Sequence, residues 1–247
     1  MNQNLPPSRR LVLAASAALA APAAFAAPLP DDVAAARGQC ERIAGRFFTR
    51  LSELGVDDRG APRIEIVYTP ARTAFDPLRR VITAPAWSQA PSALRAQVEQ
   101  WSRASGGRLD GPALFAEIYN GFMIAHEATH AYQSDLGFWR PETDQYESEM
   151  VANRGAVAFA LETPEATAHA ARVMELAAAA LRATPSPLPA AVTPRDYFNA
   201  HADAIRTDPA LHAWFEAHLL LRAWSRRDEL DFATLVTRLK LAAAPAA

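Results

Sequence analysis

The residues with the clearest chemical potential lie in the segment His126-Glu127-Ala128-Thr129-His130. Two histidines four residues apart on a helix lie one turn apart on the same face, so both imidazoles can reach one metal ion. Neutral imidazole is an ordinary zinc ligand. Glu127 lies roughly 100° around the helix from His126 and outside that pair, where its carboxylate can act as a general base on a water molecule. The segment predicts a site for one zinc ion per chain, with Glu127 as the catalytic residue.

Two histidines alone leave open a structural zinc site or no metal site, so a third ligand decides the interpretation. Two carboxylates, Glu147 and Glu149, lie in a downstream segment with a helical pattern. If Glu149 is the ligand, Asn153 lies one turn further on the same face and can hydrogen-bond a zinc-bound histidine. If Glu147 is the ligand, the equivalent position is Val151, which has no polar side-chain atom. We favour Glu149 as the ligand; Glu147 is the alternative, and both could also be solvent-exposed acids on the helix exterior.

H-E-x-x-H on one helix, followed by E-x-x-x-N on the next, resembles the gluzincin branch of zinc metallopeptidases. The 18 residues between His130 and Glu149 (131–148) are similar to the spacing in aminopeptidase N-like members. The segment that begins at His126 and ends at Gln133 also resembles small bacterial metallopeptidases of unassigned substrate. The resemblance covers roughly residues 63–161 and implies a minimal zincin-like core with a small β region, an active-site helix and a glutamate helix.

The resemblance also implies a role for each motif residue. His126, His130 and Glu149 would bind zinc. Glu127 would activate a water for hydrolysis of peptide bonds in a peptide or protein substrate, and Asn153 would orient His126. The sequence lacks the Gly-x-Met-Glu-Asn segment with which aminopeptidases hold a substrate amino terminus, so we expect an endopeptidase.

Gluzincins usually add a tyrosine or histidine that donates a hydrogen bond to the oxyanion. Tyr197 and His201 lie four residues apart and could share a helix face in this role, although a surface pair without a role is the simpler interpretation. Other residues of suitable type are Tyr132, Tyr146, His212 and His218.

The remaining sequence predicts the elements that must position these residues. Apolar residues at three- and four-residue steps predict helices, which we expect at residues 32–54, near 94–101, from 112 onward through the H-E-x-x-H segment, at 144–161, at 164–181 and within 194–240. Alternating and β-branched residues predict short strands at 63–68 and 80–83, joined by a connection that contains Asp76. We therefore expect a predominantly helical α+β fold.

A proline-rich segment at residues 185–189 separates the last helices from the rest. A piece of some 60 residues is marginal as an independent domain. We therefore expect a core at 27–184 that carries a helical C-terminal subdomain at 185–247.

Residues 1–26 have the features of a signal peptide. Arg9 and Arg10 precede an apolar stretch that has no charge until Asp31, and a small-x-small cleavage site lies at 24–26. The paired arginines resemble the twin-arginine export signal of bacteria, with a general secretory signal as the alternative. The apolar stretch is short for a membrane span. We therefore expect an exported bacterial protein, periplasmic or secreted, with no membrane span in its mature chain.

Composition excludes several other classes of protein. The 247 residues include 25 Lys and Arg and 27 Asp and Glu, so the sequence has no excess of positive charge that would indicate nucleic acid binding. The single cysteine, Cys40, excludes a disulfide framework within the chain, and its place on an apolar helix stripe predicts burial. The alternative to an enzyme is an exported helical or zincin-like protein that acts as a non-catalytic binding scaffold. The presence of Glu127 favours the enzyme, because a scaffold has no need of it.

Overall fold

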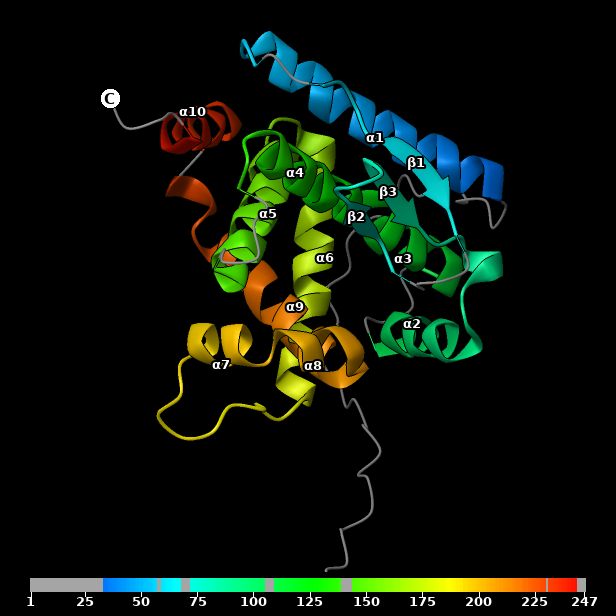
Figure 1. Cartoon of the computed structure of the whole chain (residues 1–247). Helices are drawn as coiled ribbons and strands as arrows, with labels where there is room; N and C mark the ends of the chain where they lie inside the picture. Colours follow the sequence, from blue (N-terminus) through cyan, green and yellow to red (C-terminus); the bar gives the residue numbers. More distant parts are fainter. Residues whose placement is uncertain are drawn as a thin grey trace, which may run out of the picture.

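The computed structural model describes most of the chain after the predicted export signal, namely residues 33–56, 59–67, 72–104, 109–138, 144–229 and 231–243. The signal predicted at residues 1–26 lies outside these ranges. The described residues form a predominantly helical α+β protein with one small sheet (Figure 1), which confirms the predicted fold class.

The α-helices account for most of this structure, and their bounds agree closely with the hydrophobic pattern. They are α1 (Val33–Glu53), α2 (Ser92–Ala104), α3 (Gly111–Glu117), α4 (Met123–Asp135), α5 (Gln145–Ala160), α6 (Pro164–Ala183), α7 (Pro194–Ala200), α8 (Ala202–Thr207), α9 (Pro209–Ser225) and α10 (Phe232–Ala243). Short 3-10 turns lie at η1 (Trp87–Gln89) and η3 (Arg227–Glu229). Several helices begin at a capping side chain followed by proline, as Thr163 and Pro164 do in α6. No described helix is both long and apolar enough to cross a bilayer.

The sheet consists of β1 (Arg63–Ile66), β2 (Ala74–Asp76) and β3 (Val81–Ala84) in the order β1-β3-β2. β1 pairs with β3 in parallel, with Ile64 opposite Ile82, and β2 pairs with β3 antiparallel, with Phe75 opposite Ile82. The two predicted strands are confirmed within a few residues. The interpretation of residues around Asp76 as a connection was wrong, because three residues are too few to show an alternating pattern.

Helices α1 and α4 cover one face of the sheet. α1 packs against β1, α4 packs against β2 and β3, and the two helices also contact each other (Figure 1). Residues 111–135 form one helical run in which a π-helical segment, η2 (Ile118–Phe122), joins α3 to α4. The H-E-x-x-H segment lies in α4, the part of this run that packs against β2 and β3.

The helices after residue 185 share the hydrophobic core of the preceding part. Phe47 of α1, Phe159 of α5 and Phe232 of α10 form a ring cluster with centroids 5.1–5.4 Å apart. Phe215 of α9 belongs to the same buried cluster, which also contains Cys40 as predicted. The C-terminal helices are therefore built onto the core that holds α4 and α5.

Candidate metal centre

Both histidines lie on α4 in the most buried part of the chain. Every residue of α4 from Ile124 to Gln133 is buried, and the side chains of His126 and His130 lie one turn apart with their rings 4.8 Å apart. Burial of polar groups is costly unless they are paired or hold a ligand. We therefore expect the two buried imidazoles to have hydrogen-bond partners or to bind a ligand.

Glu149 comes from the second turn of α5, a helix held at its beginning by several side chains. The Asp144 carboxylate caps α5 by accepting from the Glu147 N–H at 3.0 Å, and the Tyr146 N–H donates to the Asn199 side chain at 2.9 Å. α5 then runs along α4, and the two helices pack closely. This packing brings Glu149 to the histidine pair.

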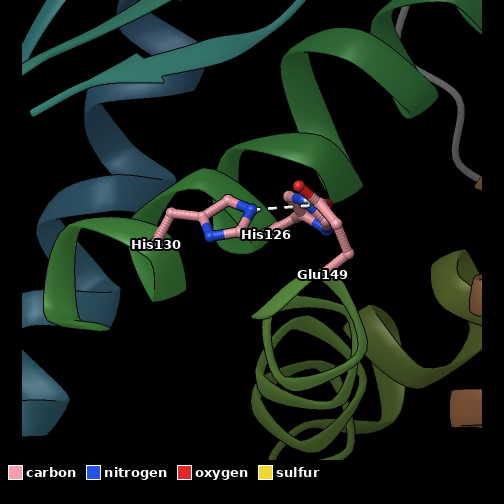
Figure 2. Close-up of side chains that lie close together, drawn as sticks. All are labelled: His126, His130 and Glu149. Carbon is pink, nitrogen blue, oxygen red and sulfur yellow. Dashed lines mark hydrogen bonds and ion pairs between the residues drawn. The ribbon is translucent and has the colours of Figure 1, made fainter. Parts of the chain in front are cut away.

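The three side chains converge between α4 and α5 (Figure 2). Glu149 Oε2 lies 3.2 Å from His126 Nε2 and 3.4 Å from His130 Nε2, and the three atoms all lie within 4.8 Å of one another. Two ligand atoms that each lie about 2.0–2.1 Å from a tetrahedral zinc ion are separated by about 3.3 Å. The separations of Glu149 from the two histidines therefore fit a shared zinc ion.

The electrostatics of the cluster also fit a cation site. Burial alone would lower the pKa of His126, but the hydrogen bond with Glu149 and the charges of Glu127 and Glu149 raise it to about 10. Burial would raise the pKa of Glu149, but the charge of His130 and the contacts with both imidazoles hold it well below its usual value. The raised pKa of His126 and the lowered pKa of Glu149 both show that these groups favour a positive charge next to the Glu149 carboxylate.

Gln133 fixes the ring of His130, a contact that the sequence reasoning missed. Gln133 Oε1 lies 2.8 Å from His130 Nδ1, and Gln133 Nε2 donates to the Ser148 carbonyl at 3.3 Å. Since the amide oxygen can only accept, Nδ1 of His130 carries the proton and Nε2 is left as the ligand atom. The sequence contains a signal for this contact, because Gln133 follows His130 by three residues and so lies next to it on the helix.

Asn153 contacts its own helix, where its Nδ2 donates to the Glu149 carbonyl at 3.0 Å. Its Oδ1 and the Nδ1 of His126 are both buried without a hydrogen-bond partner among the described residues. The proposed orientation of His126 by Asn153 stays a prediction.

The Glu127 carboxylate lies beside the ligands and is held by the edge strand. Its Oε2 accepts a hydrogen bond from the Phe75 N–H of β2 at 2.8 Å. Burial raises the pKa of Glu127, and the charges of His126 and His130 partly offset this effect. A buried carboxylate with a raised pKa next to a cation site has the properties of a general base.

The other candidates lie in different surroundings. Glu147 is exposed in the first turn of α5, outside the group of ligand atoms. Tyr197 and His201 stack on each other with centroids 4.2 Å apart, and Tyr197 also stacks on Phe215. Their contacts among the described residues do not include the three ligands, so their role stays a prediction.

Comparisons with protein-family models, with curated proteins and with solved structures found no match. The likeness to gluzincins therefore rests on the motif residues themselves.

Proposed function

We propose that this protein is a zinc-dependent peptidase that hydrolyses internal bonds of peptides or proteins. The observation that carries the proposal is the convergence of His126, His130 and Glu149 beside the Glu127 carboxylate, with Glu149 at the separation from each histidine that tetrahedral ligation requires. Three protein ligands leave one position of a tetrahedral ion for water or substrate, which is the arrangement of catalytic rather than structural zinc sites.

His126, His130 and Glu149 would hold the ion, with Gln133 keeping His130 in the required tautomer. When bound there, zinc would lower the pKa of a coordinated water toward about 7 and polarise the carbonyl of the scissile bond. The Phe75 N–H holds Oε2 of Glu127, so this carboxylate keeps a fixed orientation. Glu127 takes the proton of the attacking water and returns it to the leaving amine nitrogen, a transfer that its raised pKa favours.

His212 of α9 is better supported than Tyr197 or His201 as the hydrogen-bond donor to the substrate. Its Nδ1 lies 3.4 Å from Arg72 Nη1, and the charges of Glu149 and His126 both act on its ring. Since arginine can only donate, Nδ1 of His212 accepts, and its Nε2–H is left as a donor. Burial lowers the pKa of His212, which favours this neutral form.

We also propose that the chain acts after export, on peptides or proteins of the cell envelope. The support is the pattern of Arg9 and Arg10 before an apolar stretch. Periplasmic accumulation that persists when both arginines are changed to lysine would exclude the twin-arginine route.

The experiment that tests the peptidase proposal combines metal analysis with hydrolysis. We expect the purified protein to contain one zinc ion per chain and to cleave members of a quenched-fluorescence peptide library. A chelator should abolish cleavage, and added zinc should restore it. A protein that binds zinc but cleaves no library member would contradict the peptidase and favour a binding scaffold, and a protein without zinc would contradict the metal site itself.

A further inference from the structure

The segment that leads into β2 connects α9 to the catalytic carboxylate. At one end, Arg72 contacts His212 of α9 and donates to the Arg206 carbonyl at 3.0 Å. At the other end, Phe75 donates to Glu127. Three residues of extended chain span at most about 11 Å. The face of α9 that carries His212 is therefore tied to the metal centre by a short segment.

The middle of this segment is fixed to the helical run that carries the histidines. The Thr73 hydroxyl donates to the Tyr119 carbonyl at 2.7 Å, and Thr73 is buried. Tyr119 belongs to η2, which continues directly into α4. The segment therefore links α9, η2 and Glu127.

Glu216 lies on α9 one turn after His212 and so on the same face. Its Oε1 is buried and has no hydrogen-bond partner among the described residues. The charge of Glu216 acts on His126, His212 and Tyr119, which places its carboxylate near the candidate site. A buried carboxylate oxygen without a partner is costly, and this cost is recovered when a ligand supplies the missing donor.

The groups around Glu216 exclude two simpler explanations. Arg72 is the nearby cation, but its guanidinium is directed to His212 and the Arg206 carbonyl, and no ion pair joins it to Glu216 among the described residues. A second metal site would need at least one more ligand. Within the described ranges, the group of at least three His, Cys, Asp or Glu residues that could hold a metal ion is His126, His130 and Glu149, and it does not include Glu216.

We propose that Glu216 binds a cationic group of the substrate, an ammonium or guanidinium near the scissile bond. This inference rests on the proposed peptidase function, to which it adds a substrate class. The cation would be the side chain of lysine or arginine, since the proposed cleavage is at internal bonds. A free amino terminus presents the same N–H donors and is distinguished by the test. An apolar residue in the same place would leave the buried Oε1 of Glu216 without a hydrogen-bond partner, so this atom favours a cationic donor.

The test uses blocked peptides that place one arginine at each successive position, each paired with a peptide that has neutral citrulline there. We expect the zinc-loaded protein to cleave the arginine peptide about 10-fold more efficiently at one position, since citrulline keeps N–H donors but lacks the charge, and charge-assisted hydrogen bonds are roughly twice as strong as neutral ones. Glu216→Gln should remove this preference, so that the arginine and citrulline peptides are cleaved with similar efficiency. Glu41→Gln, on the exposed face of α1, makes the same change of charge and should keep the preference. If only unblocked peptides are cleaved, the cation is the amino terminus and the proposed cleavage of internal bonds is contradicted.

A binding measurement separates failure of this site from failure of the peptidase. Calorimetric titration of the Glu127→Gln protein with the arginine and citrulline peptides requires no turnover. Preferential binding of the arginine peptide that Glu216→Gln abolishes supports the cation site even where no peptide is cleaved. Equal binding of the two peptides, or a preference that survives Glu216→Gln in a folded protein, overturns the inference. Thermal melting of each variant shows whether it is folded.

Discussion

Gly155 of α5 lies against Thr129 of α4 so closely that no larger residue fits between the helices. A Cβ at position 155 would lie 2.3 Å from Thr129 Oγ1 and 2.6 Å from its Cγ2. Thr129 is held in place, since its hydroxyl donates to the Ala125 carbonyl at 2.9 Å. Because α4 carries the two histidines and α5 carries Glu149, this contact sets the distance between the metal ligands.

Gly155→Ala should therefore push α5 away from α4 and weaken zinc binding without touching a ligand. Overpacking of this kind costs about 1–3 kcal/mol of the free energy of unfolding. The measurement is zinc affinity by competition with a chelating dye, together with urea unfolding. The double variant Thr129→Ala with Gly155→Ala lacks the Oγ1 and Cγ2 atoms that the new Cβ would contact. It should therefore recover most of the lost zinc affinity. Unchanged zinc affinity in Gly155→Ala would contradict this account of ligand spacing.

The choice between the two glutamates of α5 has a direct test. Glu149→Ala removes a ligand atom that lies 3.2 Å from His126 Nε2, so the protein should lose its zinc on dialysis. Glu147→Ala changes an exposed side chain and should keep one zinc ion per chain. Elemental analysis of the two variants decides the matter, and the opposite pattern would make Glu147 the ligand.

Gln133→Ala should lower zinc affinity by about 10- to 100-fold, as removal of a partner behind a histidine ligand typically does. The physical reason is that His130 loses the acceptor that fixes its tautomer and ring orientation. Ser148→Ala is the control and should have a smaller effect, because it removes only the contact of Gln133 Nε2 with Ser148 Oγ at 3.4 Å and keeps the main-chain carbonyl to which Gln133 also donates. Equal affinity in Gln133→Ala and the parent would show that the packing of α4 alone orients the ring.

The sequence was sufficient for the parts of the site that depend on local helical geometry. The four-residue spacing of His126 and His130 fixes their common face in any helix. The choice of Glu149 over Glu147 relied on the side chain one turn further on, and the structure brings Glu149 to the histidines. Helix bounds followed from apolar periodicity, and the structure adds side-chain caps at Asp144 and Thr163.

The contacts that depend on distant segments could not be predicted in this way. The strand β2 has three residues, and its pairing with β3 is visible only after the chain has folded back. Arg72 reaches His212 across 140 positions of sequence, and no local pattern marks that approach. The burial of Glu216 Oε1 likewise depends on how α9 packs against α5 and α6.

Asp144 should make the start of α5 sensitive to acid. Burial would raise its pKa, but the hydrogen bonds from Asn199 and from the Glu147 N–H, with the ion pair to Arg195, lower it. A carboxylate with a lowered pKa in the folded state stabilises the protein above its unfolded pKa of about 4, and this contribution is lost as the pH falls through the folded value.

Asp144→Asn isolates that charge, because asparagine is an equally good helix cap. At pH 7 the variant should be less stable by about 0.2–1 kcal/mol, a value that allows for screening by solvent around a partly exposed pair. The difference should shrink as the pH falls below about 4. Urea unfolding of both proteins across pH 3–7 measures it, and a difference that is constant with pH would show that the charge of Asp144 has no part in it.

The most direct test of the proposed mechanism is the hydrolytic rate and zinc content of Glu127→Gln compared with the parent. A glutamine oxygen can still accept from the Phe75 N–H, so folding and zinc content should be retained. It cannot take up a proton, so kcat/KM for a cleaved peptide should fall by at least about 100-fold. A folded, zinc-loaded Glu127→Gln protein that cleaves peptides as fast as the parent would contradict the mechanism.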